Sequence, residues 1–192
     1  MTDYMYNLSI SLLLHRTDCK DFKYVDLGSG TGVSAIHLVE KHSDVIAKAT
    51  CLNMCQDQNI TAKERGTELN LLDRIDIAEA SFDETPCDSN AYDLAFSQDA
   101  FIHAWSKEKL YAEAYRITKP VGALVFCDLM RGDNPDLTVQ ELAEFAQKNR
   151  INDWLNPSQN VKACTKVGWK DVKVSRIMIA VSSNINLLQQ LC

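Results

Sequence analysis

Three glycines at alternate positions, Gly28, Gly30 and Gly32, follow a short apolar run that carries an acidic residue, Asp26, near its end. Glycine lacks a Cβ and accepts positive φ, so a ligand can lie directly against the backbone of such a turn. The residues after Gly32 read as the start of a helix, which offers unpaired N–H groups and the positive end of a dipole. Residues 23–32 therefore predict a strand, a glycine turn and a helix that bind a nucleotide-type ligand. An ordinary strand-to-helix turn is the alternative.

The spacing of the glycines discriminates between ligands. The dinucleotide fingerprint G-x-G-x-x-G places its third glycine three residues after the second, and that position is Val33 in this chain. Asp26 precedes the first glycine by two residues. A carboxylate there suits a cationic ligand better than a pyrophosphate, which points to S-adenosylmethionine with its amino and sulfonium groups.

The pattern around this turn predicts strands that alternate with helices. Apolar, strand-like runs occupy residues 23–27, 46–52, 75–79, 92–97 and 123–128, and helical periodicity occupies residues 33–42, 56–68 and 107–117. A turn is expected at residues 119–122, helices at 138–149 and 158–167, and further strands at 171–176 and 177–181. The chain therefore predicts one α/β domain over residues 1–192, a Rossmann-like, doubly wound and mainly parallel sheet of six to seven strands with helices on both faces.

Ligands of such sheets bind beyond the carboxyl ends of the strands, where the strand order reverses. The glycine turn, Asn53, residues 80–82 and residues 97–99 all fall at predicted strand ends. Asn53 stands where a carboxylate usually meets the ribose, and its amide can still hydrogen-bond a hydroxyl. The equally weighted alternative is that Asn53 only begins a turn.

Composition excludes several classes of protein. The 192 residues carry a formal charge of −6 and no basic block, which argues against nucleic-acid or anionic-membrane partners. Seven irregularly spaced cysteines indicate reduced thiols and a cytoplasmic location, and Cys51 and Cys55 without a nearby histidine make a poor metal site. The apolar residues 8–14 are too short to span a bilayer and lack the flanks of a signal peptide. No metal is expected.

The segment from Asp26 to Gly32 resembles the first motif of class I S-adenosylmethionine-dependent methyltransferases. A narrower resemblance is to the sarcosine/dimethylglycine and glycine/sarcosine N-methyltransferases that form betaine. It rests on Ser97, Gln98, Asp99 and Ala100 with His103, on Cys51-Leu-Asn53 followed by Gln58-Asn59, on Ala80-Ser81-Phe82, and on Cys127-Asp-Leu-Met130. The resemblance covers about residues 24–174, with leucine at position 129 where that branch usually has proline.

This resemblance implies roles for the residues at the strand ends. Gly28, Ser29 and Gly30 would pass along the methionine part of the cofactor, and Asp26 would support the turn or meet the amino group. The ribose would lie between Asn53, which hydrogen-bonds it, and Met54, which packs on it. Ala80, Ser81 and Phe82 would border the adenine, and Ser97 and Gln98 would approach the methionine end through backbone or side chain.

The resemblance implies methyl transfer to the amine of glycine, sarcosine or dimethylglycine, in a monomer or homodimer. The alternatives are a C- or O-methyltransferase for a lipid or secondary metabolite, and a non-catalytic cofactor-binding remnant of the fold. A neutral amine needs no strong base, and His103 is the best candidate for a polar contact near the methyl group; the alternative is a helix-start residue. Asp99 could orient the acceptor or cap a turn, and Arg131 could pair with an acceptor carboxylate or lie in solvent. Trp105 and Trp154 could line an amine pocket or belong to the core or rim.

The family has a helical segment before the first strand that closes over the cofactor, and it continues past the sixth strand with substrate-binding residues. This chain has only residues 1–22 before its first strand and ends at Cys192. The expectation is therefore a core domain whose N-terminal lid and C-terminal extension are short or missing.

Overall fold

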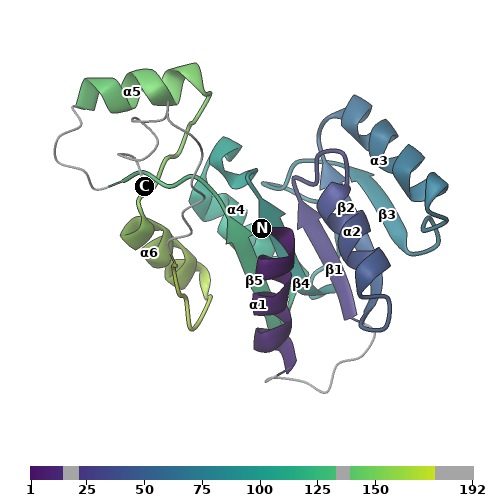
Figure 1. Cartoon of the computed structure of the whole chain (residues 1–192). Helices are drawn as coiled ribbons and strands as arrows, with labels where there is room; N and C mark the ends of the chain where they lie inside the picture. The colour runs from purple at the N-terminus through teal and green to yellow at the C-terminus, as the bar shows by residue number, and fades with distance from the viewer. Residues whose placement is uncertain (15–21, 133–138, 176–192) are drawn as a thin grey trace.

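The computed structural model of the chain describes residues 1–14, 22–132 and 139–175. Its centre is a parallel sheet in the order β3-β2-β1-β4-β5 (Figure 1). The strands are β1 (Phe22–Leu27), β2 (Ile46–Asn53), β3 (Ile75–Glu79), β4 (Tyr92–Gln98) and β5 (Thr118–Cys127). The predicted Rossmann-like α/β fold is confirmed. The predicted count of six to seven strands is not confirmed, because the described residues contain five.

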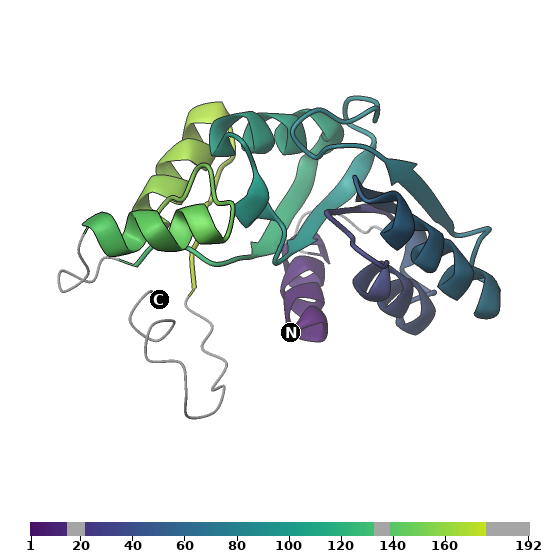
Figure 2. The same cartoon turned by 90° about the horizontal axis from the view of Figure 1, so that it is seen from above.

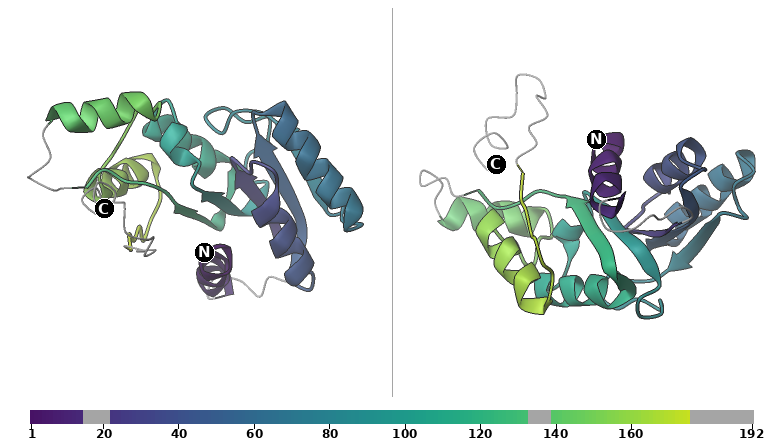
Figure 3. Two further views of the ribbon diagram at one scale, coloured as in Figure 1. Left: turned by 45° about the horizontal axis from the view of Figure 1, so that its top comes forward. Right: turned by 90° about the horizontal axis from the view of Figure 1, so that it is seen from below.

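Helices cover both faces of the sheet, as Figure 2 shows from above. One layer holds α1 (Thr2–Leu14), α2 (Val33–Lys41) and α3 (Gln56–Glu68), and the other holds α4 (Lys107–Ile117) and α6 (Pro157–Val167). Within the first layer, α1 packs on β5 and β4 while α2 and α3 pack on β1, β2 and β3 (Figure 3). A 3-10 turn, η1 (Phe101–His103), follows β4, and α5 (Val139–Lys148) follows the loop after β5.

The sheet separates two apolar cores. Tyr24 and Phe96, from neighbouring strands, meet edge to face at 5.8 Å in the core below α1 and α2. Val25 and Ala95 face the other core, where Leu110 and other residues of α4 pack. Because β1 and β4 bury side chains on both faces, they read in sequence as nearly continuous apolar runs.

Local capping explains where the helices on the second face begin. Ser106 caps α4 by accepting a hydrogen bond from the backbone N–H of Lys109. Asn156 and Gln159 form a capping box at the start of α6, and Gly168, at φ 116°, ends that helix as expected. The predicted start of α5 at Thr138 lies outside the described residues.

Two predicted segments are corrected. The predicted turn at residues 119–122 is part of β5, because Tyr92 pairs with Thr118 and Leu94 with Ala123. Four residues of β5 therefore bulge opposite the single residue Asp93. A Cβ on Gly122 would lie 2.7 Å from the Asp93 carbonyl oxygen, so only glycine fits this bulge.

The predicted strand at residues 171–176 is also wrong over its described part, since residues 171–175 pair with no strand there. The predicted strand at 177–181 lies outside the described residues. No helix in the described ranges combines the length and apolarity needed to cross a membrane.

Candidate functional site

The carboxyl ends of the strands bring the predicted loops to one edge of the sheet. The chain runs outward from β1 to β2 and β3, then returns to place β4 and β5 on the other side of β1. The order therefore reverses between β1 and β4, where ligands of open α/β sheets bind. The glycine loop, the β2–α3 turn, the loop after β3 and the turn after β4 all meet there.

The glycine loop adopts the conformation that its residues predict. Gly28, Gly30 and Gly32 have φ values of 82°, 54° and 73°, in the left-handed region that side chains disfavour. The backbone N–H groups of Gly28 and Ser29 both donate to the Leu52 carbonyl oxygen, at 2.8 and 3.1 Å. These bonds tie the loop to the end of β2, and Gly32 is the N-cap residue directly before α2.

The surroundings of the three glycines differ, and the difference defines the ligand side of the loop. A Cβ on Gly28 would lie 2.4 Å from the Ala100 Cβ, and one on Gly32 would lie 2.9 Å from the Ala62 Cβ. A Cβ on Gly30 would have no atom within 4 Å. Gly28 and Gly32 are therefore packing positions, while Gly30 faces open space in which a ligand can approach the backbone. The loop fits the cofactor that the sequence predicts.

Asp26 lies beneath this loop and is only 2% exposed. Burial raises the pKa of its carboxyl group to about 7. No lysine, arginine or histidine of the described residues forms an ion pair with it. A buried carboxylate without a positive partner raises the local affinity for a cation. Because Asp26 is buried beneath the loop, its position favours the role of supporting the turn.

Asn53 ends β2, and its side-chain amide turns toward the start of α3. Its Nδ2 donates to Gln58 Oε1 at 3.0 Å, and its backbone oxygen accepts from Asn59 Nδ2 at 3.0 Å. Among the described hydrogen bonds, its Oδ1 accepts none, so that oxygen can accept a bond from a ribose hydroxyl. Met54 beside it is 67% exposed, as the predicted packing against a ligand requires.

The loop after β3 approaches the glycine loop through Phe82. The Phe82 ring meets the Phe101 ring at 5.6 Å, and its Cε1 lies 3.5 Å from the Cβ position of Gly28. Ser81 Oγ accepts a hydrogen bond from the Asp83 backbone N–H at 3.1 Å, and Ala80 N–H donates to the Asn53 carbonyl oxygen. Ala80, Ser81 and Phe82 therefore lie beside the glycine loop and Asn53, as the adenine border requires.

The end of β4 uses its side chains internally. Ser97 is fully buried and its Oγ donates to the Leu27 carbonyl oxygen at 2.7 Å. Gln98 Oε1 accepts a hydrogen bond from Thr2 Oγ1 at 2.9 Å, which brings the start of α1 to the crevice. Because the Ser97 hydroxyl is already bound to Leu27, Ser97 can approach the methionine end of the cofactor only through its backbone.

The predicted acceptor-side residues fall on the turn after β4. Asp99 is exposed and has φ 55°, and its N–H donates to the Cys127 carbonyl oxygen at 2.8 Å. His103 is exposed at the end of η1, and no described residue hydrogen-bonds its ring. Trp105 follows with 76% of its surface exposed. Asp99 and His103 thus lie within four residues of each other on one turn that also carries Ala100.

Two other predicted acceptor residues lie farther along the chain. Arg131 donates through Nη2 to Gln159 Oε1 at 3.4 Å, so its guanidinium already has a partner at the start of α6. Trp154 stacks on Phe145 at 5.2 Å, which supports its reading as a rim residue packed against α5. The structure does not bring Arg131 or Trp154 into a described contact with Asp99 or His103.

Sequence reasoning missed Lys107, which shapes this region, and it named Ala100 only as part of a motif without a packing role. The Ala100 Cβ lies 2.4 Å from the position that a Cβ on Gly28 would take, so the two residues pack closely. Lys107 is only 4% exposed, and a lysine in the first turn of a helix gives no sequence signal of burial. The Lys107 ammonium reaches the turn after β4, where Nζ donates to the Phe101 carbonyl oxygen.

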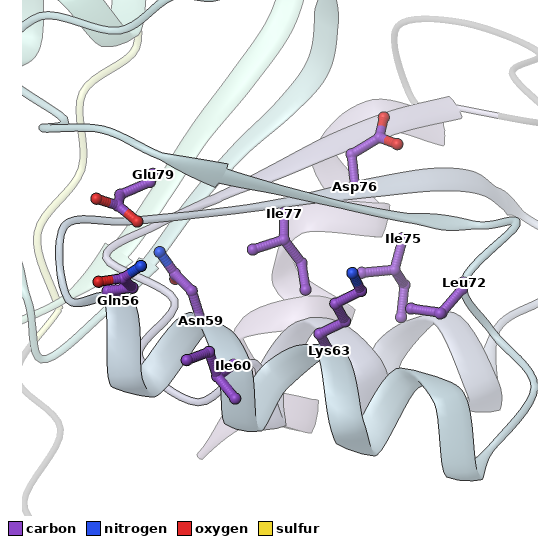
Figure 4. Close-up of a pocket in the computed structure, with 9 residues that line it drawn as sticks. All are labelled: Gln56, Asn59, Ile60, Lys63, Leu72, Ile75, Asp76, Ile77 and Glu79. Atoms are coloured by element: carbon purple, nitrogen blue, oxygen red, sulfur yellow. The ribbon is translucent and has the colours of Figure 1, made fainter.

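A groove of about 480 Å³ runs between α3 and β3, at the edge of the sheet (Figure 4). Its side chains come from the two elements and from Leu72 in the loop between them, and include Gln56, Ile60, Lys63 and Ile77. One end of the groove reaches Glu79, which pairs with Asn53 in the β2–β3 ladder. The groove therefore adjoins the predicted ribose position without containing the glycine loop. The described residues contain no His, Cys, Asp and Glu group arranged to hold a metal ion.

Comparison with known proteins identifies one family model, described as a methyltransferase domain, that matches residues 25–126. The chain is 36% identical over 112 residues to the sarcosine/dimethylglycine N-methyltransferase of Aphanothece halophytica, a match that covers 58% of this chain and 39% of that protein.

Solved structures give the same result for the fold. A protein of Galdieria sulphuraria, assigned as a sarcosine dimethylglycine methyltransferase, superposes with a TM-score of 0.75 at 28% identity, over 87% of this chain and 60% of that one. Phosphoethanolamine N-methyltransferase 2 of Haemonchus contortus, with phosphomonomethylethanolamine and S-adenosylhomocysteine, superposes with a TM-score of 0.72 at 20% identity, over 86% and 37%. The chain thus spans about two fifths to three fifths of the length of these relatives.

Proposed function

Because this chain belongs to the methyltransferase-domain family of class I S-adenosylmethionine-dependent enzymes, we propose that it binds S-adenosylmethionine and methylates the amine of a small molecule. The proposed acceptor is glycine, sarcosine or dimethylglycine. The observation that carries the proposal is the open side of Gly30 at the strand-order reversal, in a chain 36% identical to a sarcosine/dimethylglycine N-methyltransferase over 112 residues.

Each loop of the crevice has a proposed part in holding the cofactor. Gly28, Ser29 and Gly30 present backbone to its methionine part, and buried Asp26 keeps the loop in place and favours a cation above it. Asn53 Oδ1 accepts from a ribose hydroxyl while Met54 packs against the sugar. The loop of Ala80, Ser81 and Phe82 borders the adenine, and Ser97 and Gln98 lie at the methionine end through their backbone.

The cofactor supplies an electrophilic methyl group on a sulfonium, and the protein's task is alignment of the amine with that group. An in-line displacement gains most from holding the two reacting atoms close together and excluding water. A neutral amine attacks with its lone pair, so no side chain has to remove a proton before the bond forms. This explains how a site with Asp99 and His103 on the turn after β4, and no strong base among them, can support the reaction.

We propose that His103 and Asp99 contact the acceptor. Both are exposed on the turn after β4, which touches the glycine loop through Ala100, so an acceptor beside them lies next to the cofactor site. The Asp99 carboxylate can accept a hydrogen bond from the neutral amine and stabilises the positive charge that the nitrogen gains as the methyl group is transferred, and the His103 ring offers a hydrogen bond. Arg131 is a poorer candidate for the acceptor carboxylate, because Gln159 already holds its guanidinium.

An acceptor screen tests the reaction class. The protein is incubated with methyl-labelled S-adenosylmethionine and with glycine, sarcosine or dimethylglycine, and transfer is followed by mass spectrometry. We expect labelled sarcosine, dimethylglycine or betaine, and about a tenfold or larger loss of rate in His103→Ala. Transfer only to a phenol, a sterol or a carbon nucleophile would replace the amine by the C- or O-methyl alternative.

The remaining proposals concern the protein as a whole. We propose a single methyltransferase core domain, present as a monomer or homodimer in the cytoplasm. The cytoplasmic assignment is supported by the described cysteines, since Cys51, Cys55, Cys87, Cys127 and Cys164 are all free thiols, as a reducing compartment requires.

A further inference from the structure

We propose that Lys107 is a positioning residue that holds the acceptor-binding turn, with Asp128 as its counter-ion. This inference rests on the proposed function, because the turn in question carries Asp99 and His103. It concerns a residue that lies within the protein and does not touch the acceptor.

The Lys107 side chain is enclosed at the junction of several segments. It belongs to the first turn of α4, and only 6% of its side chain is exposed. Its Nζ donates to the Phe101 carbonyl oxygen, in the middle of the turn that carries Ala100 and His103. Its backbone N–H donates to Asp153 Oδ2 at 2.6 Å, which fixes the start of α4 to the loop before α6. One residue therefore joins α4, η1 and that loop.

The counter-ion of this buried ammonium is Asp128, the residue that follows β5. Its side chain is 4% exposed, and its Oδ2 lies 4.0 Å from Lys107 Nζ. Oδ1 accepts a hydrogen bond from the Leu129 backbone N–H at 2.7 Å, whereas Oδ2 has no hydrogen-bond partner among the described residues. A buried carboxylate left without hydrogen bonds at one oxygen needs a nearby positive charge, and Lys107 is the cation that the structure places there.

The buried Lys107–Asp128 pair adjoins the turn that carries the exposed residues Asp99 and His103. Asp99 N–H donates to the carbonyl oxygen of Cys127, the neighbour of Asp128, and His103 N–H donates to the Ala100 carbonyl oxygen. The turn from 99 to 103 is thus held on one side by β5 and on the other by Lys107. The turn touches the cofactor loops through the side chains of Ala100 and Phe101, whereas the glycine loop itself is tied to the Leu52 carbonyl oxygen and has no described bond to Lys107.

Because Lys107 holds the acceptor turn and not the glycine loop, its loss should affect the acceptor site and the cofactor site differently. Loss of the ammonium removes one of the two hydrogen bonds to the Phe101 carbonyl oxygen, which keeps only that from the Ala104 N–H. The turn that orients His103 and Asp99 is thereby loosened, while the bonds of the glycine loop to Leu52 are unaffected. Substitution of Lys107 should therefore impair use of the acceptor and spare binding of the cofactor. Substitution of a residue needed only for stability would impair both use of the acceptor and binding of the cofactor, or neither of them.

The test compares Lys107→Met with a matched control, Lys119→Met. Lys119 of β5 pairs with Asp93 of β4 at 2.8 Å, at the end of β5 opposite to Asp128. Since a buried charge left alone can prevent folding, the double variant Lys107→Met/Asp128→Asn, which leaves neither charge, is measured beside the single variant. Each protein is examined by hydrogen exchange, by calorimetry with S-adenosylmethionine and by acceptor kinetics.

In Lys107→Met, and in the double variant, we expect amide exchange at Asp99, His103 and Ala104 to accelerate about ten- to a hundredfold, as loss of a charged hydrogen bond implies. Acceptor kcat/KM should fall by a similar factor, with the Kd for the cofactor within about threefold of the parent value. Lys119→Met should change none of the three. Unchanged exchange, or a loss of cofactor affinity as large as the loss of acceptor use, would overturn the proposal.

The experiment distinguishes failure of the proposed amine methylation from failure of the positioning role of Lys107. If the parent protein methylates no amine, the proposed function is wrong, and the exchange measurement still decides whether Lys107 holds the turn. If the parent protein methylates an amine and Lys107→Met does so equally well, only the positioning role is wrong.

Discussion

Ala100 lies directly against Gly28: a Cβ on Gly28 would come within 2.4 Å of the Ala100 Cβ. The two residues belong to different strand ends, since Gly28 follows β1 and Ala100 follows β4. Their contact brings the turn with Asp99 and His103 against the glycine loop at the reversal of strand order. The proposed cofactor and acceptor sites therefore share a wall made of two of the smallest side chains in the protein.

The first prediction separates packing from ligand binding within the glycine loop. Gly28→Ala should lose about 2–4 kcal/mol of stability, from left-handed backbone strain and overlap with Ala100. Gly30→Ala should lose only about 1 kcal/mol, because the new Cβ meets no atom within 4 Å. That Cβ would nevertheless occupy the space proposed for the cofactor, so Gly30→Ala should weaken S-adenosylmethionine binding by about tenfold or more.

Thermal unfolding and calorimetry of the two alanine variants check this prediction. Gly66→Ala, in α3, serves as the control, since it adds the same methyl group away from the crevice. Normal cofactor affinity in Gly30→Ala would place the ligand elsewhere.

The second prediction concerns Arg65, which reaches from α3 to the glycine loop. Its Nη1 donates to the Thr31 carbonyl oxygen at 3.1 Å and to Thr31 Oγ1 at 2.8 Å. Arg65→Met keeps the aliphatic stem but removes both bonds, and should raise the cofactor Kd about three- to thirtyfold by loosening the loop. Lys63→Met on the same helix is the matched control and should leave the Kd unchanged. Equal Kd values in the two variants would contradict an anchoring role for Arg65.

The third prediction is a pH dependence from Asp26, whose pKa burial raises to about 7. The unfolded chain releases this proton near pH 4, so between about pH 4 and 7 the folded state holds more protons and loses stability as pH rises. Asp26→Asn removes this loss and should stabilise the ligand-free protein at pH 8 by about 4 kcal/mol relative to its effect at pH 4. Unfolding midpoints at both pH values measure it.

A pH-independent effect of Asp26→Asn would show that the carboxylate is not strained by burial. The same variant should bind the cofactor more weakly, because it removes the negative charge beneath the loop. Greater stability of Asp26→Asn at pH 8, together with weaker cofactor binding, is expected if the Asp26 carboxylate serves to bind the cofactor.

The fourth prediction distinguishes the backbone of Ser97 from its side chain. Ser97→Ala removes the 2.7 Å bond to the Leu27 carbonyl oxygen and should cost about 1–2 kcal/mol of stability. Cofactor affinity should stay within about threefold, because the hydroxyl is already bound to Leu27 and is not free for the ligand. Chemical denaturation and calorimetry on the same samples test both parts. A large loss of affinity with unchanged stability would assign the hydroxyl to the ligand.

Much of the fold follows from local sequence. The strands from β1 to β4 are short, mainly apolar runs bounded by turn residues, so they could be predicted. The glycine turn could be predicted because it contains three glycines at alternate positions. The start of β5 could not: Pro120 and Gly122 read as a turn, but the pairing of Leu94 with Ala123 turns the same residues into a bulge inside the strand. Strand pairing is a long-range property that overrides the local signal.

The candidate site shows the same division. Gly28 and Gly30 could be identified from spacing, but their different roles depend on the contact of Gly28 with Ala100, which lies 72 positions after Gly28 in the chain. Ser97 is predicted to approach the ligand through its backbone or its side chain, and the fold uses its hydroxyl to join two strands. Burial of Lys107 has no local signature, because it arises only where α4, η1 and Asp128 come together.

Isothermal titration of the unmodified chain with S-adenosylmethionine and S-adenosylhomocysteine tests the central claim most directly. We predict one molecule of either ligand per chain, with a Kd between about 1 μM and 1 mM, and loss of the signal in Gly30→Ala under conditions where that variant remains folded. The absence of binding heat for both ligands at about 5 mM, confirmed at a second temperature, would contradict it.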